Sequence, residues 1–280
     1  MDSLSPSITA ANDAALGAED DLPLMLPGRP KMQYNLPKAW HHFKELVKDK
    51  ENTAEVAKIF EALPWTGVYD AAKAFLSTER GQKIRASEPS LVTILDDHAS
   101  LRRLPKGTVA HAYCDFMERE GLSAQGLVDE LDRYRPADMY FNDQVDWYFR
   151  RMRDTHDLMH VLTGYGRDAL GEQCVLAFTY SQQPALAHLF LGYAGAFEIA
   201  RRATVKVPVF RAVREGQKSG KACPRLVEMP IRDLLAMPLE EARAKLGINA
   251  GRYYRQAHDM WRAAGIDPYD LMAPVNKQAA

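Results

Sequence analysis

The chain has 280 residues, of which 46% are hydrophobic and 26% are charged, and its formal net charge is −1. These proportions are typical of a soluble globular protein, and the balanced charge gives no overall field that would attract nucleic acid. Three widely spaced cysteines, Cys114, Cys174 and Cys223, lack the CxxC spacing of a zinc knuckle or thiol redox site and indicate a reducing compartment.

Residues 1–35 are predicted to be a flexible tail. The first 30 residues carry five acidic residues against one arginine and lack the apolar core of a secretory signal. Their low apolar content also argues against folding. The most apolar stretch of the chain, residues 185–200, has only 16 residues and contains His188 and Glu198, whereas about 20 uninterrupted apolar residues are needed to cross a bilayer. The sequence therefore predicts no transmembrane span.

From residue 36 onwards the apolar residues recur at helical spacing, which predicts a single all-α domain over 36–280, built as a helical bundle. The first expected helices cover 39–63 with a break near Asn52–Thr53 and a cap by Thr53, 68–86 with an end near Gly81, 90–104, 108–121 and 123–136. Thr108 and Ser123 are the predicted start residues of the last two. The best strand-like fragment is 205–210, which its proline weakens.

One further helix, predicted over residues 145–162, carries two histidines. At about 100° per residue its large apolar side chains share a stripe with His156, while His160 lies close beside that stripe and Asp157 at its edge. A lone histidine on an apolar face is usually a hydrogen-bonded core residue. Two histidines four residues apart beside a carboxylate can instead bind one metal ion, as the histidines of HExxH zinc sites do.

A glycine-rich segment, 163–171, separates this helix from the next, in which Glu172 is the predicted opening residue and which Pro184 stops. The second helix is apolar enough to pack as an antiparallel neighbour of the first, so the short connection should bring Glu172 close to His160. Two imidazole nitrogens and carboxylate oxygens then predict a metal site between two antiparallel helices. The ligand types suit zinc, with non-haem iron or another divalent ion as alternatives.

Arg153 lies one helical turn before both His156 and Asp157. Its predicted roles are to orient Asp157 or to bind an anionic group of a substrate beside the metal. The alternative is a surface arginine in a helix ion pair, which contributes about 0.3–0.5 kcal/mol.

The pattern HDxxH, eleven residues, then E resembles the motif of the ubiquinone (coenzyme Q) biosynthesis protein 4 family. The similarity extends over about residues 90–250. Residues 104–117 (LPKGTVAHAYCDFM) resemble the family's LPxGSLGxxYxxFM stretch, and Arg153 matches an arginine three residues before the first histidine. The ALGE of 169–172 matches the family's LGE ending, and 238–248 resemble its C-terminal segment.

The resemblance implies a mainly α-helical protein that is peripheral to a membrane, here expected on its cytoplasmic face. It also implies a divalent metal, usually zinc, bound by His156, Asp157, His160 and Glu172. The implied reaction is the loss of the carboxylate from a polyprenylated hydroxybenzoate ring, coupled to hydroxylation at the same carbon. The implied partners are a polyprenylated benzoquinone precursor and other proteins of ubiquinone biosynthesis. A lipid-binding scaffold without catalysis is the alternative role.

Other features leave further alternatives open. Residues 201–225 hold eight Lys or Arg against one Glu, which fits an anionic membrane surface or a solvated face. The apolar helices are compatible with a homodimer. His111 and Asp233 would be the extra ligands if the HD pair belonged to a phosphohydrolase instead. The remaining histidines that lack ligand spacing, His41, His42, His98 and His258, are assigned no role.

Overall fold

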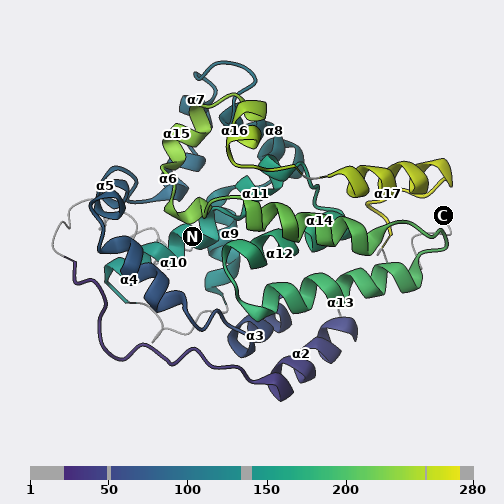
Figure 1. The fold of residues 1–280 in the computed structure, drawn as a ribbon, viewed down its shortest axis with the longest axis horizontal. Helices are drawn as coiled ribbons and strands as arrows, with labels where there is room; N and C mark the ends of the chain where they lie inside the picture. Colours follow the sequence, from purple (N-terminus) through teal and green to yellow (C-terminus); the bar gives the residue numbers. More distant parts are fainter. Residues whose placement is uncertain (1–21, 49–51, 134–140, 250, 272–280) are drawn as a thin grey trace, which may run out of the picture.

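The computed structural model describes residues 22–48, 52–133, 141–249 and 251–271, which form helices joined by short turns (Figure 1). Among these residues the structure contains no β-strand, and Thr108 and Pro238 form an isolated bridge. The prediction of a single all-α domain is therefore confirmed. The fragment 205–210 is not a strand, because its last two residues already belong to a helix that begins at Val209.

The first helices run from the N-terminal region to the segment that precedes the histidines. They are α2 (Leu36–Lys48), α3 (Thr53–Ala62), α4 (Val68–Leu76), α5 (Glu79–Ser87), α6 (Leu91–Leu95), α7 (His98–Leu101), α8 (Val109–Glu120) and α9 (Ala124–Asp132). The break predicted near residue 52 is confirmed, but the predicted cap is wrong, because Thr53 is the first residue of α3 and Asn52 precedes it as the cap residue, with a side chain that accepts no capping hydrogen bond.

The remaining helices carry the candidate site and the C-terminal part of the chain. They are α10 (Gln144–Asp154), α11 (His156–Thr163), α12 (Ala169–Gln182), α13 (Leu186–Arg202), α14 (Val209–Ala222), the 3₁₀ turn η3 (Leu226–Glu228), α15 (Ile231–Ala236), α16 (Leu239–Lys245) and α17 (Arg252–Ala263). Within the described ranges no helix combines the length and apolarity that a bilayer crossing needs.

Capping side chains explain where two predicted helices differ from the structure. The end near Gly81 predicted for the 68–86 helix was wrong. The first helix, α4, ends at Leu76, and a second helix, α5, begins at Glu79 because Thr78 caps it by accepting a hydrogen bond from the Gly81 amide at 3.0 Å. The helix predicted over 90–104 is split in the same way, since Asp97 accepts from the Ser100 amide at 3.0 Å and starts α7. The starts predicted at Thr108 and Ser123 are confirmed.

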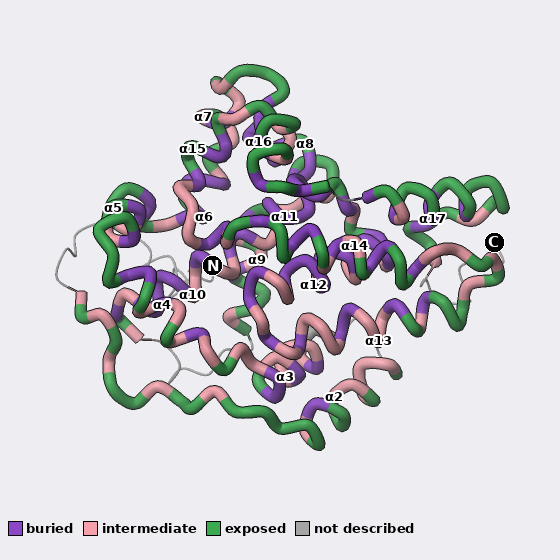
Figure 2. The backbone as a smooth tube through the Cα atoms, in the orientation of Figure 1, coloured by how far each residue is buried: buried purple, intermediate pink, exposed green. Residues whose placement is uncertain are grey.

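The core lies around α12, which packs most extensively against α14 and then against α13. Figure 2 shows α11 and α12 mostly buried in the middle of the molecule. Two glycines one turn apart on α14 permit the close contact with α12, because a Cβ on Gly216 would lie 2.5 Å from the Cys174 carbonyl oxygen. A Cβ on Gly220 would lie 2.3 Å from the Phe178 carbonyl oxygen. Larger residues at these two positions would push the helices apart.

The described part of the predicted tail, residues 22–35, lies against the helices. The Leu26 amide donates to Asp143 Oδ2 at 2.7 Å, and the Arg29 guanidinium pairs with the same carboxylate. The Val145 amide donates to the Leu24 carbonyl at 3.2 Å. This segment therefore holds the N-terminal end of α10, the helix that leads to the histidines, while residues 1–21 lie outside the described part of the chain.

Candidate metal centre

The predicted helix over 145–162 is interrupted at one residue, Thr155, which separates α10 from α11. The backbone ladder nevertheless continues through it, because Thr155 donates to the Arg151 carbonyl at 3.2 Å and Met159 donates to the Thr155 carbonyl at 3.3 Å. His156 and His160 consequently remain one turn apart on the same side of α11. Within the expected stripe Val145, Tyr148 and Met159 are buried and His156 is half-buried, while His160 beside it is 1% exposed.

A tight turn returns the chain from α11 to α12. Gly164 ends α11 with φ of +73°, a left-handed conformation that glycine adopts without steric cost. Asp168 caps α12 by accepting from the Leu170 and Gly171 amides at 3.1 and 3.2 Å. The helix thus begins three residues earlier than the sequence predicted, at Ala169, and Glu172 lies in its first turn.

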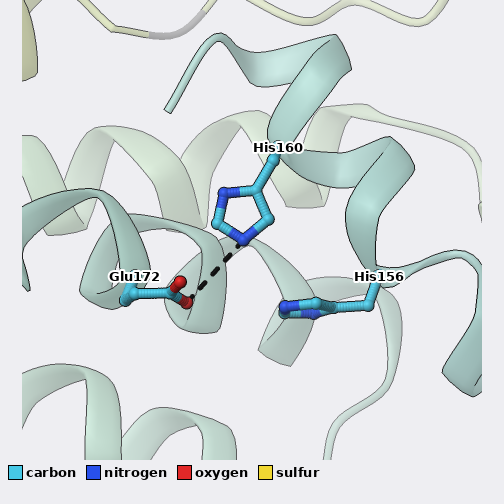
Figure 3. Close-up of side chains that lie close together, drawn as sticks. All are labelled: His156, His160 and Glu172. Atoms are coloured by element: carbon cyan, nitrogen blue, oxygen red, sulfur yellow. Dashed lines mark ion pairs between the residues drawn. The ribbon is translucent and has the colours of Figure 1, made fainter. Parts of the chain in front are cut away.

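The turn brings three of the predicted ligands together, as Figure 3 shows for His156, His160 and Glu172. Each offers one ligand atom, and these atoms all lie within 4.8 Å of one another. Glu172 Oε2 is 3.7 Å from His160 Nε2. The two imidazole rings are nearly perpendicular, at 82°, with centroids 5.1 Å apart.

A backbone carbonyl fixes the tautomer of His160. Its Nδ1 lies 3.0 Å from the Tyr165 carbonyl oxygen. A carbonyl can only accept, so Nδ1 carries the proton and Nε2 keeps its lone pair toward Glu172. The ring is also stacked on Phe116, with centroids 5.4 Å apart and planes at 20°. Metal-binding histidines are commonly oriented by such an outer hydrogen bond.

Burial shifts the pKa of each of the three side chains so that its uncharged form is favoured. Burial, and after it the neighbouring His156, lower the pKa of His160 to about 3. Burial likewise lowers the pKa of His156. It raises the pKa of Glu172 to about 8, against the opposing effect of Arg167. Both imidazoles are therefore neutral at physiological pH, the state in which they can bind a metal ion.

Arg167, which no sequence pattern singled out, forms an ion pair with Glu172. Its Nε lies 3.8 Å from Glu172 Oε1, and its side chain is 43% exposed. Its charge lowers the pKa of both histidines and of Glu172. It comes from the turn between the helices, so only the folded turn places it beside the ligands.

The other two predicted site residues are not part of the group of three. Asp157 is buried, with a pKa raised by that burial and lowered by His156, but it contributes no atom to the group of three. Arg153 Nε binds its neighbour Asp154 at 2.7 Å and lines a cavity with Arg29, Tyr69 and Phe149. The structure therefore does not bring Arg153 to Asp157 or to the histidines.

Two histidines outside the group have partners of their own. His111 Nε2 lies 2.7 Å from the Leu104 carbonyl oxygen, so it does not complete a phosphohydrolase site with Asp233, which is exposed on α15. His258, assigned no role from the sequence, has its Nε2 3.0 Å from Asp168 Oδ1, the cap of α12. In the sequence, His258 stood out only as part of an HD dipeptide with Asp259, without a second histidine four residues away.

The ligand set fits a divalent cation. Two histidines and one glutamate are the protein ligands of several catalytic zinc sites, which keep a fourth position open. Ligand atoms at about 2.1 Å from a tetrahedral ion are about 3.4 Å apart. The three atoms here lie within 4.8 Å of one another, so no pair would have to approach by more than about 1.4 Å on binding. Neutral imidazoles, a fixed tautomer and a carboxyl directed at the same space are the features that such binding requires.

Sequence comparison places most of the chain in one family. The sequence profile described as coenzyme Q (ubiquinone) biosynthesis protein Coq4 matches residues 43–252. The chain is 28% identical over 198 residues to the mitochondrial ubiquinone biosynthesis protein coq4 of Talaromyces stipitatus, covering 70% of this chain and 65% of that one. It is 25% identical over 183 residues to the mitochondrial coq4 protein of Sclerotinia sclerotiorum, covering 65% and 61%. These matches span just under two thirds of the relatives' lengths.

Structural comparison gives the same fold. A crystal structure of a candidate ubiquinone biosynthesis protein from Nostoc punctiforme superimposes with a TM-score of 0.50. The match covers 78% of this chain and all of the other at 21% sequence identity. At that identity the comparison supports the arrangement of the helices.

Proposed function

The chain belongs to the coenzyme Q (ubiquinone) biosynthesis protein Coq4 family, and from this premise we propose that it is a metal-dependent enzyme of ubiquinone biosynthesis. Its proposed reaction is the loss of the carboxylate as CO2 from a polyprenylated hydroxybenzoate ring, coupled to hydroxylation at the same carbon with molecular oxygen as the two-electron oxidant, at a membrane surface. The observation that carries the proposal is the convergence of His156, His160 and Glu172, with the tautomer of His160 set by the Tyr165 carbonyl. Zinc is the proposed ion, with iron or another divalent ion as alternatives.

The three residues would hold the cation, which when bound supplies Lewis acidity toward an oxygen of the substrate. His156 and His160 present neutral nitrogens at neutral pH because burial lowers the pKa of both. Glu172, whose pKa is raised to about 8, gives up its proton when a cation binds. Asp157, buried beside His156, keeps the proposed role of a fourth ligand or of a partner that orients a histidine.

Arg167 is the residue best placed to pair with the carboxylate of the substrate. It is half-exposed, lies 3.8 Å from Glu172 and carries the positive charge that an anionic ring needs beside the ligands. The catalytic role predicted for Arg153 stays a prediction, and the two arginines can be compared directly. Arg167→Ala is expected to lower the rate of CO2 release more than Arg153→Ala, because Arg153 already binds Asp154.

The test of the enzymatic proposal is release of CO2 from a carboxyl-labelled polyprenylated hydroxybenzoate in the presence of oxygen. Wild-type protein loaded with zinc, and separately with iron(II), should release labelled CO2. His156→Ala should not, whereas His98→Ala serves as a matched control because His98 pairs with Glu118 and is not one of the three ligands. Equal release from wild type and His156→Ala would reject the enzymatic role.

Membrane association is proposed from the surface of α14 and the end of α13. The cations of this region that face solvent are Arg201, Arg202, Lys206, Arg211, Arg214, Lys218 and Lys221. Phe197 and Phe210 are 58% and 45% exposed in the same region, while Val209, Ala212 and Val213 face the core. Exposed aromatic and basic side chains favour an anionic bilayer surface, at about 1 kcal/mol per cation near the surface.

Liposome flotation tests this part of the proposal. Binding should increase with the fraction of anionic lipid and should fall when Arg211, Arg214 and Lys218 are changed to Glu. Reversing Lys48, Lys73 and Lys83, which are cations of other helices, is the matched control. If flotation depends neither on the fraction of anionic lipid nor on the α14 substitutions, this surface is excluded as the membrane contact.

The alternative role is a lipid-binding scaffold that organises other proteins of ubiquinone biosynthesis. The basic and aromatic surface supports it, because that surface shares no residue with the three ligands. A scaffold should restore ubiquinone synthesis in a deletion strain even when His156, His160 and Glu172 are all replaced by Ala. An enzyme should not. A homodimer through the apolar helices stays a prediction that sedimentation analysis can test.

A further inference from the structure

The C-terminal helix α17 reaches the turn that joins the two ligand-bearing helices. Tyr254 and His258, one turn apart on α17, both contact Asp168, which is 2% exposed. The Tyr254 hydroxyl donates to Asp168 Oδ2, and His258 Nε2 donates to Oδ1 at 3.0 Å. Neither residue belongs to the group of three ligands.

Asp168 therefore does more than cap a helix. A helix cap needs one oxygen, and Oδ1 of Asp168 already accepts from the Leu170 and Gly171 amides that begin α12. Its second oxygen is held by Tyr254. A buried carboxylate is stable only when its oxygens are hydrogen-bonded. The contacts from α17 consequently fix the position of the first turn of α12, where Glu172 lies.

The same tyrosine acts on the His160 side of the turn. The Gly166 amide donates to the Tyr254 hydroxyl at 3.0 Å, and the Tyr165 carbonyl accepts from His160 Nδ1 at 3.0 Å. This carbonyl and this amide belong to one peptide unit. In a planar trans peptide they point in opposite directions, so holding the amide on Tyr254 directs the carbonyl at His160. The rings of Tyr165 and Tyr254 also meet edge to face, with centroids 5.2 Å apart.

From these contacts we propose that Tyr254 and His258 are positioning residues of the candidate metal centre. One hydroxyl group accepts from the peptide unit that sets the tautomer of His160 and donates to the carboxylate that caps the helix of Glu172. Tyr254 thereby fixes both ligands relative to each other, and His258 supports it through Asp168. The inference rests on the proposed metal site, and outer partners of metal ligands typically contribute about 10- to 100-fold to metal affinity.

Tyr254→Phe is the primary variant, because it removes only the hydroxyl, and Tyr253→Phe is the matched control. Tyr253 is the preceding residue, and its ring lies beside Arg211 and Arg252, away from Asp168. Zinc affinity, measured by competition with a chromophoric chelator, should fall about tenfold in Tyr254→Phe. It should stay within twofold of wild type in Tyr253→Phe.

A second readout needs no metal. Nitrogen-15 NMR of the metal-free protein should show His160 as the Nδ1–H tautomer in wild type and as a mixture in Tyr254→Phe. Hydrogen exchange of the Gly166 amide should accelerate in the variant. If Tyr254→Phe does not fold, His258→Ala replaces it, with His258→Gln as the conservative variant, since a glutamine amide can donate to Asp168. His258→Ala should lower zinc affinity, and His258→Gln should largely restore it.

The two readouts separate this inference from the proposed function. An unchanged His160 tautomer and unchanged Gly166 exchange in Tyr254→Phe would overturn the positioning role, and so would a changed tautomer with wild-type zinc affinity. The wild-type protein could bind no zinc while Tyr254→Phe still alters the His160 tautomer. That result would support the positioning of His160 by Tyr254 and reject the metal site. A shift in tautomer together with the loss of affinity supports both.

Discussion

Two polar clusters that include side chains of the consecutive helices α10 and α11 differ in how their groups are satisfied. In the first, Arg151 and Glu88 are each 1% exposed and pair at 2.6 Å. Arg151 Nε also donates to the Val227 carbonyl at 2.8 Å. Glu88 accepts from the Ile231 and Arg232 amides at 3.0 and 2.7 Å. These groups bind one another and tie α10 to α5 and to the start of α15, while Arg151 Nη1 is buried without a hydrogen-bond partner.

The second cluster, His156, His160 and Glu172, has the opposite character. Its three ligand atoms face a common space and all lie within 4.8 Å of one another, and Glu172 Oε2 is 3.7 Å from His160 Nε2, beyond hydrogen-bond distance. Burial holds the imidazoles neutral and favours the protonated carboxyl, as the lowered and raised pKa values show. Removing one member of a buried pair of opposite charges destabilises the fold, whereas a cluster whose lone pairs converge on the same space is suited to an added cation.

The largest expected effect on stability comes from breaking the Arg151–Glu88 pair. Glu88→Gln leaves the Arg151 charge buried without its counter-ion, so the free energy of unfolding should fall by about 3–5 kcal/mol. Urea denaturation with and without chelator measures it, and the loss should be the same in both conditions. A decrease below about 1 kcal/mol would show that the Arg151–Glu88 pair is not the structural element that its contacts indicate.

A smaller effect is expected at the converging cluster, and only when metal is present. Zinc at about 100 times its dissociation constant should raise the free energy of unfolding of the wild type by about 2.7 kcal/mol. His160→Ala and Glu172→Gln should both abolish this increase, while His98→Ala should retain it. Thermal unfolding with and without zinc measures the difference. Retention of the full increase in both ligand variants would place the cation elsewhere.

The pH dependence of the metal-free protein sharpens the contrast. The pKa of Glu172 is raised by burial to about 8 from an ordinary value of 4.5, so between these pH values the folded state holds a proton that the unfolded state has lost. Stability from this group is present at low pH and falls as pH rises toward 8. In excess chelator, wild type should therefore lose stability relative to Glu172→Gln over this range. A parallel pH profile for the two proteins would contradict the shift.

The smallest expected effect concerns the two arginines. Arg167 lies 3.8 Å from Glu172, so its positive charge opposes a bound cation. Arg167→Ala should raise zinc affinity by about 1.5- to 5-fold, in line with the 0.2–1 kcal/mol typical of exposed charge pairs. Arg153→Ala should leave zinc affinity unchanged because Arg153 pairs with Asp154. Chelator competition measures both variants, and lower affinity in Arg167→Ala would contradict the placement of its charge.

The sequence alone determined the all-helical class, the facing of His156 and His160 toward the interior, and the return of Glu172 across a short turn. These follow from local rules, because the helical repeat fixes which residues share a face and glycine ends a helix wherever a left-handed residue is needed. Errors at Thr78, Asp97 and Thr155 are also local in origin. Hydrogen bonds of these side chains to nearby backbone groups divide helices whose apolar pattern is continuous.

Only the tertiary structure decided which polar residues belong together. Glu88 and Arg151 are 63 residues apart, and Asp168 and His258 are 90 apart, so no spacing in the sequence links them. Arg167 pairs with the ligand Glu172, whereas Arg153 pairs with Asp154, and only the folded chain determines these partners. Helical periodicity places a residue on a face, but the packing of distant helices determines what that face meets.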